Sequence, residues 1–191
     1  MIKIGILGAI GSGKTFVSKQ FGLPVFNADK EVLKIYKKNK ICFKKIKNKF
    51  DKYQLTFPLK KKDLGKIILD NNKNIKELNK IVHPLVRKEI NFFYKKNKYK
   101  KAVVLDIPLL LENNIYDKNF ILVFVDSNKK QIFRRLKKRK NYNSKIFKIL
   151  QKIQLPVEFK RKKSDYIIKN NFIKSSLKKN VKLLKKNLFN K

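Results

Sequence analysis

The chain has 191 residues, of which 42% are hydrophobic, enough to build the core of one domain and to exclude a mostly disordered protein. Lysine and arginine number 51 and aspartate and glutamate 13, so the formal net charge is +38. Such a charge suggests nucleic acid or an anionic membrane as a partner. The excess is almost entirely lysine, however, and lysine, asparagine, isoleucine and phenylalanine share A/T-rich codons. We therefore interpret the charge as the mark of a skewed genome composition, and we expect no specific nucleic-acid partner.

The sequence also limits where the protein works. Its single cysteine, Cys42, excludes an intrachain disulfide and a cysteine-based zinc cluster. No apolar run reaches the roughly 18 residues that a membrane helix needs, and residues 1–7 are too short for a signal peptide. We expect a protein of the reducing cytoplasm without a membrane partner.

Apolar, β-prone segments alternate with helical ones along the chain. The predicted strands are 2–7, 23–26, 102–106, 120–125 and 166–168. The predicted helices cover 15–21, 30–50, 131–150 and 175–190, and the third of these is interrupted near 141–143. Several more helices are predicted over 51–100, including a new one that has Pro84 in its first turn. This alternation predicts an α/β fold with a parallel sheet covered on both faces. The stretch between the second and third strands is too long for a simple crossover and predicts an inserted helical subdomain.

A phosphate-binding loop follows the first predicted strand. The run Gly8-Ala9-Ile10-Gly11-Ser12-Gly13-Lys14-Thr15 matches G-x-x-x-x-G-K-[ST] at every fixed position. The glycines let successive backbone N–H groups point at phosphate oxygens, and the following helix adds the positive end of its dipole. Lys14 would reach the β- and γ-phosphates of ATP, and the Thr15 hydroxyl would hold Mg²⁺. The expected ATP-binding residues of this segment are Gly11, Ser12, Gly13, Lys14, Thr15 and, through its backbone N–H, Phe16.

The phosphate loop by itself does not choose among kinases, GTPases and motor-like ATPases. A GTPase should carry an Asn-Lys-x-Asp guanine reader, but residues 128–131 read Asn-Lys-Lys-Gln. No Asp-x-x-Gly begins at Asp106 either. The sequence therefore favours a small-molecule kinase.

Asp29 lies just after the second predicted strand. Carboxyl ends of parallel strands line the ligand crevice, so Asp29 would lie near the phosphate loop and could accept a proton from an attacking hydroxyl. An aspartate before a helical stretch is also an ordinary N-cap. Spacing does not choose between these readings, and both can hold together.

Further segments resemble the dephospho-CoA kinase family over nearly the whole chain. Besides the phosphate loop they are VFNADK at 25–30, IVHPLVR at 81–87, LDIPLLLE at 105–112, and residues 135–139, 154–156 and 164–170. The His-Pro and Asp-Ile-Pro-Leu-Leu segments, in this order and spacing, are the most specific. The resemblance implies a P-loop NTPase three-layer fold with a five-stranded parallel sheet. It also implies ATP-dependent phosphorylation of the ribose 3′-hydroxyl of dephospho-CoA, which gives coenzyme A.

The resemblance also implies roles and domain limits. Asp29, Lys14 and Arg139 become the catalytic residues, and a basic lid over 131–163 places Arg135 and Arg139 on ATP. The acceptor-binding residues become Asp29, His83, Arg87 and Asp106, within a core of 1–29, 101–130 and 164–191 and an acceptor-binding insert of 30–100. His83 could instead cap a helix, Arg87 could hold a surface carboxylate, and Asp106 could bind Mg²⁺ rather than the acceptor ribose.

The chain departs from the family pattern at a few positions. Asn27 stands where Asp is frequent, Lys61 and Leu150 where Arg is usual, Lys169 where Asp is usual, and Phe16 in place of a second hydroxyl. These changes bear on the lid and the acceptor site rather than on the class of reaction. Glu112 is interpreted as a helix-surface charge.

Two alternative functions remain at this point. A nucleoside monophosphate kinase shares the loop, insert and lid, but it would need arginines for its acceptor phosphate, and 30–95 holds only Arg87. A nucleic-acid-binding P-loop protein should show the aromatic and basic signature of a known module, and none is visible.

Overall fold

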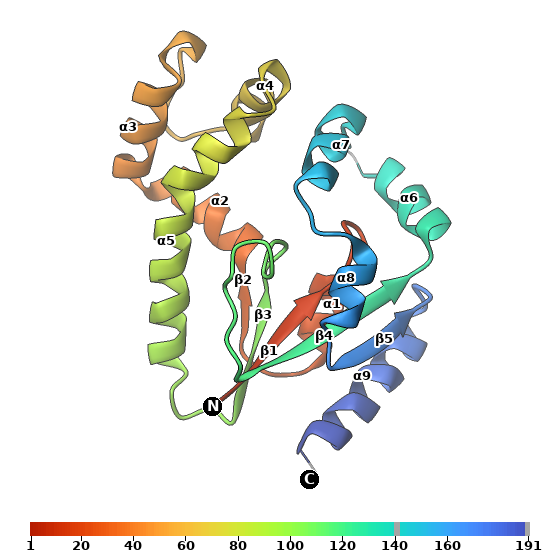
Figure 1. Cartoon of the computed structure of the whole chain (residues 1–191). Helices are drawn as coiled ribbons and strands as arrows, with labels where there is room; N and C mark the ends of the chain where they lie inside the picture. Colours follow the sequence, from red (N-terminus) through yellow and green to blue (C-terminus); the bar gives the residue numbers. More distant parts are fainter. Residues whose placement is uncertain (140–141, 190–191) are drawn as a thin grey trace. The chain divides into compact units, whose positions relative to one another are not determined.

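The computed structural model describes residues 1–139 and 142–189. Strands and helices alternate in it much as the sequence predicts (Figure 1). In chain order the elements are β1 (Ile2–Leu7), α1 (Lys14–Gln20), β2 (Val25–Asn27), α2 (Ala28–Lys38), α3 (Lys40–Lys49), the 3₁₀-helix η1 (Asp51–Tyr53), α4 (Lys61–Asp70), α5 (Asn74–Lys96), β3 (Ala102–Asp106), β4 (Phe120–Ser127), α6 (Lys129–Lys137), α7 (Ser144–Lys152), α8 (Val157–Lys162), β5 (Tyr166–Asn170) and α9 (Lys174–Phe189).

The five strands form one parallel sheet in the order β2-β3-β1-β4-β5. The central strand β1 pairs Ile4 with Val104 of β3 and with Ile121 of β4. Parallel strands are joined by crossovers that place helices on the faces of the sheet, so the strands read as continuous apolar runs. The predicted α/β class with a five-stranded parallel sheet is confirmed.

The chain clusters into two units, which we describe separately. The sheet unit comprises Met1–Asn27, Asn97–Tyr142 and Gln151–Lys191, and the helical unit comprises Ala28–Lys96 and Asn143–Leu150. Residues 143–150, inside the predicted lid of 131–163, thus belong with the helical unit. The predicted roles of the insert and of the lid stay predictions.

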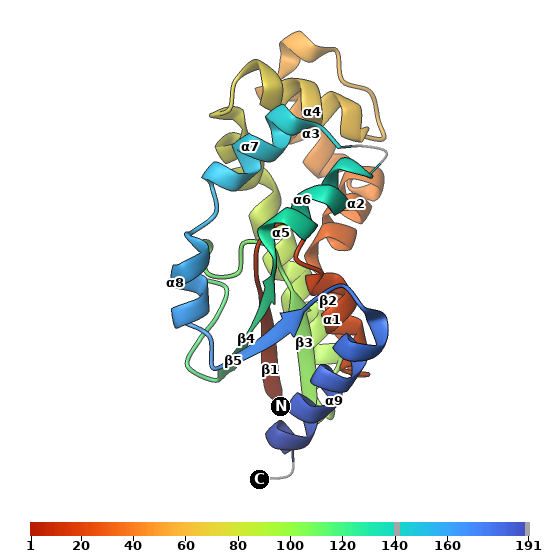
Figure 2. The same ribbon diagram turned by 90° about the vertical axis from the view of Figure 1, so that its right-hand side faces the viewer.

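Helices α1 and α9 cover one face of the sheet, and α8 lies on the other (Figure 2). Alternate strand residues face α1 and α9, because successive side chains of a strand point to opposite faces. The core between them comprises Ile4, Ile6, Ala102, Val104, Val123, Val125 and Ile168 of the strands, Val17 and Phe21 at α1, and Leu177, Val181 and Leu184 of α9. This packing holds α1, and with it the phosphate loop at its start, against the sheet.

Gly5 of β1 makes room for a buried side chain on the opposite face. A Cβ at this position would lie 2.5 Å from Leu110 Cδ2 and 3.0 Å from Leu122 Cδ2. Gly5→Ala should lower the free energy of unfolding by about 1–3 kcal/mol, the usual cost of overpacking a core. Chemical denaturation measures this change.

Gly65→Ala is the matched control, because its new Cβ would meet only Ile146 Cδ1 at 3.4 Å, an ordinary contact. Gly65 lies inside α4, where alanine stabilises a helix relative to glycine by about 0.5–1 kcal/mol. Equal stability of the Gly5→Ala protein and the unchanged protein would contradict the packing described for β1.

Within the helical unit, the prediction for Pro84 is wrong. Pro84 lies inside α5 rather than in the first turn of a new helix. Proline removes one backbone hydrogen bond and usually interrupts a helix. Here buried apolar residues continue along one face on both sides of the proline, with Val82 before it and Val86 and Ile90 after it. Burial of this face keeps the helix continuous.

Other element limits differ from prediction more locally. The helical stretch 30–50 is divided at Asn39, whose side chain accepts a hydrogen bond from the Cys42 N–H and caps α3. Helix α8 was not predicted. The predicted break near 141–143 falls between α6 and α7, although Asn141 itself lies outside the described residues, as does Asn190 at the end of the last predicted helix. None of the helices in the described ranges has the length and apolar character that crossing a bilayer requires.

Candidate functional site

The predicted phosphate loop joins β1 to α1. Gly8, Gly11 and Gly13 have φ values of 145°, 85° and 96°, a region that residues with a Cβ rarely adopt. Lys14 is buried, and its Nζ donates to the carbonyl oxygens of Gly8 at 3.0 Å and Ala9 at 2.9 Å. The loop therefore has the backbone conformation that its glycines predict, and it encloses the amine of Lys14.

Two side chains that were not predicted from the sequence hold this loop, one from β4 and one from β5. The Ser12 carbonyl accepts from Asn170 Nδ2 at 2.7 Å and from Ser127 Oγ at 2.9 Å. A Cβ on Gly13 would lie 2.5 Å from Asn170 Nδ2, so only glycine fits there. Asn170 and Ser127 end β5 and β4, and polar residues at the carboxyl ends of parallel strands were the signal that could have identified them.

The Ser12 hydroxyl oxygen is buried and has no hydrogen-bond partner within the described part of the chain. A buried polar atom of this kind usually finds a partner. Together with the bend at Gly8 and Gly13, where a Cβ would clash with Ser12 Oγ and Asn170 Nδ2, it fits a loop built to receive an anionic group.

Thr15, Asp106 and Asn27 meet at the carboxyl edge of the sheet. Asp106 is 3% exposed, and its Oδ2 accepts from Thr15 Oγ1 at 2.6 Å and from Asn27 Nδ2. Asn27 and Asp106 are register partners in β2 and β3. Residues 1–139 and 142–189 contain no cluster of three or more His, Cys, Asp or Glu side chains that could hold a metal ion. A hydroxyl beside a carboxylate nevertheless offers the oxygen ligands that Mg²⁺ prefers when phosphates supply the others.

Arg135 stands beside the loop because α6 packs on it. A Cβ on Gly11 would lie 3.0 Å from Leu136 Cγ of α6. The Arg135 guanidinium carbon lies 4.3 Å from the centroid of the Phe172 ring. These side chains border a pocket of about 100 Å³ that is lined by Gly13, Phe16, Arg135, Asn170, Phe172, Ile173, Lys174 and Leu177. A stacked cation and ring next to a phosphate loop can receive a flat aromatic base. No pattern in the sequence indicated a role for Phe172.

Arg139 lies just beyond α6 and is exposed. Its backbone N–H donates to the Leu136 carbonyl at 3.0 Å, which continues the last turn of the helix. Its next neighbours, Lys140 and Asn141, lie outside the described residues. The predicted role of Arg139 on a lid stays a prediction.

The remaining predicted site residues belong to the helical unit. Asp29 is the second residue of α2 and is exposed, so it lies in the first helical turn rather than at the N-cap position. A carboxylate there favours the helix through the dipole. His83 and Arg87 are one turn apart on α5, and burial, then the charge of Arg87, lowers the pKa of His83 from its ordinary value. The imidazole is therefore mainly neutral at pH 7.

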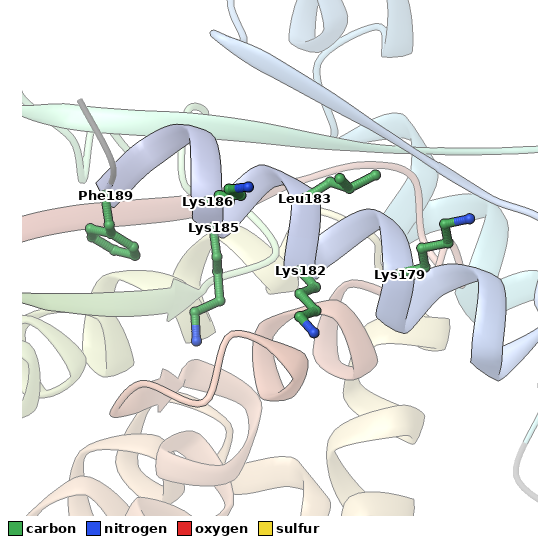
Figure 3. A pocket seen from close by; sticks show the side chains of 6 residues that line it. All are labelled: Lys179, Lys182, Leu183, Lys185, Lys186 and Phe189. Carbon is green, nitrogen blue, oxygen red and sulfur yellow. The ribbon is translucent and has the colours of Figure 1, made fainter.

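A second pocket, of about 560 Å³, lies along α9 in the sheet unit (Figure 3). It is lined by Lys179, Lys182, Leu183, Lys185, Lys186 and Phe189. These residues include neither a carboxylate nor a hydroxyl, so the pocket lacks the oxygen groups that would hold Mg²⁺ or accept a proton in phosphoryl transfer. The candidate site is therefore the phosphate loop with Asp106, Asn170 and Arg135.

Comparison with known proteins identifies the group to which this arrangement belongs. The family model described as dephospho-CoA kinase matches residues 2–175. A dephospho-CoA kinase of Wolbachia pipientis wMel is 34% identical over 184 residues, which are 94% of this chain and 94% of the relative. One from Bacillus thuringiensis is 35% identical over 179 residues, 89% of this chain and 88% of the relative.

A crystal structure of a Thermus thermophilus protein has the same fold. It aligns with a TM-score of 0.75 and 26% identity over 98% of this chain and 97% of its own. The family match over residues 2–175 includes the phosphate loop and the His-Pro segment, and therefore residues of both units. The chain is therefore a P-loop kinase, and it belongs to the dephospho-CoA kinase family.

Proposed function

We propose that the protein transfers the γ-phosphoryl group of ATP to the ribose 3′-hydroxyl of dephospho-CoA, the last step of coenzyme A synthesis. The observation that carries the proposal is the phosphate loop closed around Lys14, with Thr15 and Asp106 beside it, in a chain of this family. The loop explains how ATP is held, and family membership identifies the acceptor.

On the ATP side, the backbone N–H groups of residues 11 and 13–15 hold the β- and γ-phosphates. The N–H groups of Ser12 and Phe16 already donate to the carbonyls of Ala9 and Gly13, which differs from the expected phosphate contact of Phe16. The Lys14 amine has a flexible stem and moves from the carbonyls of Gly8 and Ala9 to the phosphate oxygens. The adenine base enters the pocket beside Arg135 and Phe172, where the guanidinium and the ring offer flat surfaces.

Mg²⁺ would be held by the Thr15 hydroxyl and the Asp106 carboxylate. When bound, it neutralises charge on the β- and γ-phosphates. Asn27 donates to the same oxygen of Asp106 and so fixes the direction of that carboxylate. An aspartate at position 27 would instead place two carboxylates side by side, and the two would repel each other. The asparagine of this chain avoids that repulsion and leaves the Asp106 carboxylate directed at Thr15.

On the acceptor side, Asp29 accepts the proton of the ribose hydroxyl. It follows Asn27 by two residues, so the chain limits its distance from β2 to about 7 Å between Cα atoms. His83 and Arg87 bind dephospho-CoA, the neutral imidazole by hydrogen bonding and the guanidinium by pairing with an acceptor phosphate. Arg135 and Arg139 stabilise the charge that develops on the transferred group.

A panel of acceptors tests this function. With Mg²⁺ and ATP, we expect steady phosphorylation of dephospho-CoA and little reaction of AMP, GMP or UMP. The structural reason is that a nucleoside monophosphate site needs several arginines, whereas residues 28–96 contain only Arg87. Phosphorus NMR of the product should show a new 3′-phosphomonoester. Comparable turnover on any nucleoside monophosphate would favour the monophosphate kinase alternative.

A further inference from the structure

A buried ion pair lies in the sheet unit. Lys160 Nζ of α8 is 2.7 Å from Glu112 Oε1, and the two side chains are 2% and 9% exposed. The interpretation of Glu112 as a helix-surface charge is therefore wrong: the residue lies in the turn segment between β3 and β4, and its carboxylate is shielded from water. Buried pairs contribute little net stability, because desolvation of both charges offsets their attraction. The pair calls for an explanation other than stability.

The same carboxylate oxygen also holds the backbone. Glu112 Oε1 accepts a hydrogen bond from the Leu155 N–H at 3.0 Å. Leu155 lies four residues after the chain re-enters the sheet unit at Gln151 and two residues before α8 begins. The Lys160 N–H in turn donates to the Pro156 carbonyl at 3.1 Å. Glu112 therefore binds both ends of the segment 155–160.

The support of Glu112 is itself rigid. The segment that carries it starts directly after Asp106 and is buried at Ile107, Leu110 and Leu111, which are 4%, 0% and 4% exposed. Leu110 packs against the sheet at Gly5. The Asn113 N–H donates to Leu109 and the Ile115 N–H to Leu110, so the turn is closed by its own backbone. Glu112 thus links the returning chain to the segment that begins at Asp106.

We propose that Glu112 is a positioning residue for phosphoryl transfer, which ties the segment 155–160 to the turn that begins at Asp106. Both ends of this tie lie within the sheet unit, which also carries the phosphate loop. A loosened turn would displace the Asp106 carboxylate beside Thr15, and misplacement by about 1 Å can cost up to about 10²-fold in rate. The inference rests on the proposed role of Asp106.

Two double variants separate positioning from stability. Glu112→Gln with Lys160→Met and Glu112→Leu with Lys160→Met both remove the two charges, so neither leaves a lone buried ion. They differ in one respect: glutamine keeps an acceptor oxygen for the Leu155 N–H, and leucine does not. We expect near-normal turnover for the Gln/Met protein. We expect the Leu/Met protein to lose about tenfold in kcat with a nearly unchanged KM for ATP, as for a contact that matters in the transition state.

Hydrogen exchange over residues 151–156, followed by mass spectrometry, provides a readout other than activity. Exchange should accelerate in the Leu/Met protein only, at temperatures well below its Tm. Leu155→Pro removes the donor instead of the acceptor and leaves the ion pair in place. It should reproduce the loss in kcat, and it tests the inference if the Leu/Met protein fails to fold.

The possible results separate the two proposals. The positioning role would be overturned if the two double variants and Leu155→Pro all had the same kcat. It would also be overturned if both double variants lost kcat only in proportion to their fall in Tm. Failure of the proposed function would look different, because the unchanged protein would then not phosphorylate dephospho-CoA. The exchange measurement would still show whether Glu112 anchors residues 151–156.

Discussion

Replacing Asp29 by asparagine should lower kcat for transfer to dephospho-CoA by about 10²-fold or more, the scale of losing a general base. Asparagine has the same shape, so α2 and the affinity for ATP should survive. The phosphoryl transition state is loose, and positioning of the hydroxyl then matters beside proton removal. Asp29→Glu separates the two contributions, because it keeps the charge and moves it. Single-turnover transfer, measured beside a thermal melt of each variant, gives both quantities.

Glu31→Gln is the matched control for Asp29→Asn. Glu31 also lies in the first turn of α2, so its neutralisation removes the same favourable interaction with the helix dipole, about 0.3–1 kcal/mol, together with its surface ion pair to Lys34. The control should lose this stability and keep its turnover. If a folded Asp29→Asn protein transfers phosphoryl groups at a near-normal rate, Asp29 acts only on its helix, and Asp106 becomes the next residue to test as the base.

Replacing Lys14 by methionine should lower kcat/KM for ATP by about 10²–10³-fold, the usual loss when one preorganised donor is removed from a developing charge. Methionine keeps the length and the apolar stem of the side chain, which is buried in the loop. The carbonyls of Gly8 and Ala9 lose a donor, at a cost of about 1–3 kcal/mol in stability. Steady-state kinetics with varied ATP and a denaturation curve measure the two effects.

Lys19→Met provides the comparison on the same helix. Lys19 is exposed in the last turn of α1, and its loss removes one positive charge without touching the loop. The substitution should lower the free energy of unfolding by roughly 0.3 kcal/mol, because it removes a favourable interaction with the helix dipole, and it should leave kcat/KM unchanged. An equal fall in both variants would attribute the Lys14 effect to overall charge instead of to a contact with phosphate.

Much of the fold could be predicted from the sequence, because its signals are local. Buried parallel strands are continuous apolar runs, and β1, β3 and β4 were predicted closely for that reason. The phosphate loop is specified by residues that are neighbours in the chain, since its glycines permit the positive-φ bend that other residues rarely adopt. Thr15 and Asp106 were each candidates for holding Mg²⁺, but the hydrogen bond between them was not predicted.

The errors arose where packing outweighs local preference. Pro84 ordinarily starts or breaks a helix, but α5 continues through it because the apolar face with Val82 and Val86 is buried on both sides. Helix α8 has only six residues and little apolar periodicity, so its sequence resembles a basic loop. Its lysine at position 160 looks like a surface charge until Glu112 is found beside it.

The sequence by itself determined the α/β class, the phosphate loop and the kinase family, because each depends on residue types in a fixed local order. Only the tertiary structure decided that Asn170 and Ser127 hold the loop through Ser12, that Phe172 stacks on Arg135, and that Glu112 binds Leu155 and Lys160. These partners are separated by 37 to 158 positions in the chain. Polar residues at strand ends can be recognised in the sequence, but which of them meet cannot, because the contacts exist only after the sheet has brought distant strand ends and helices together.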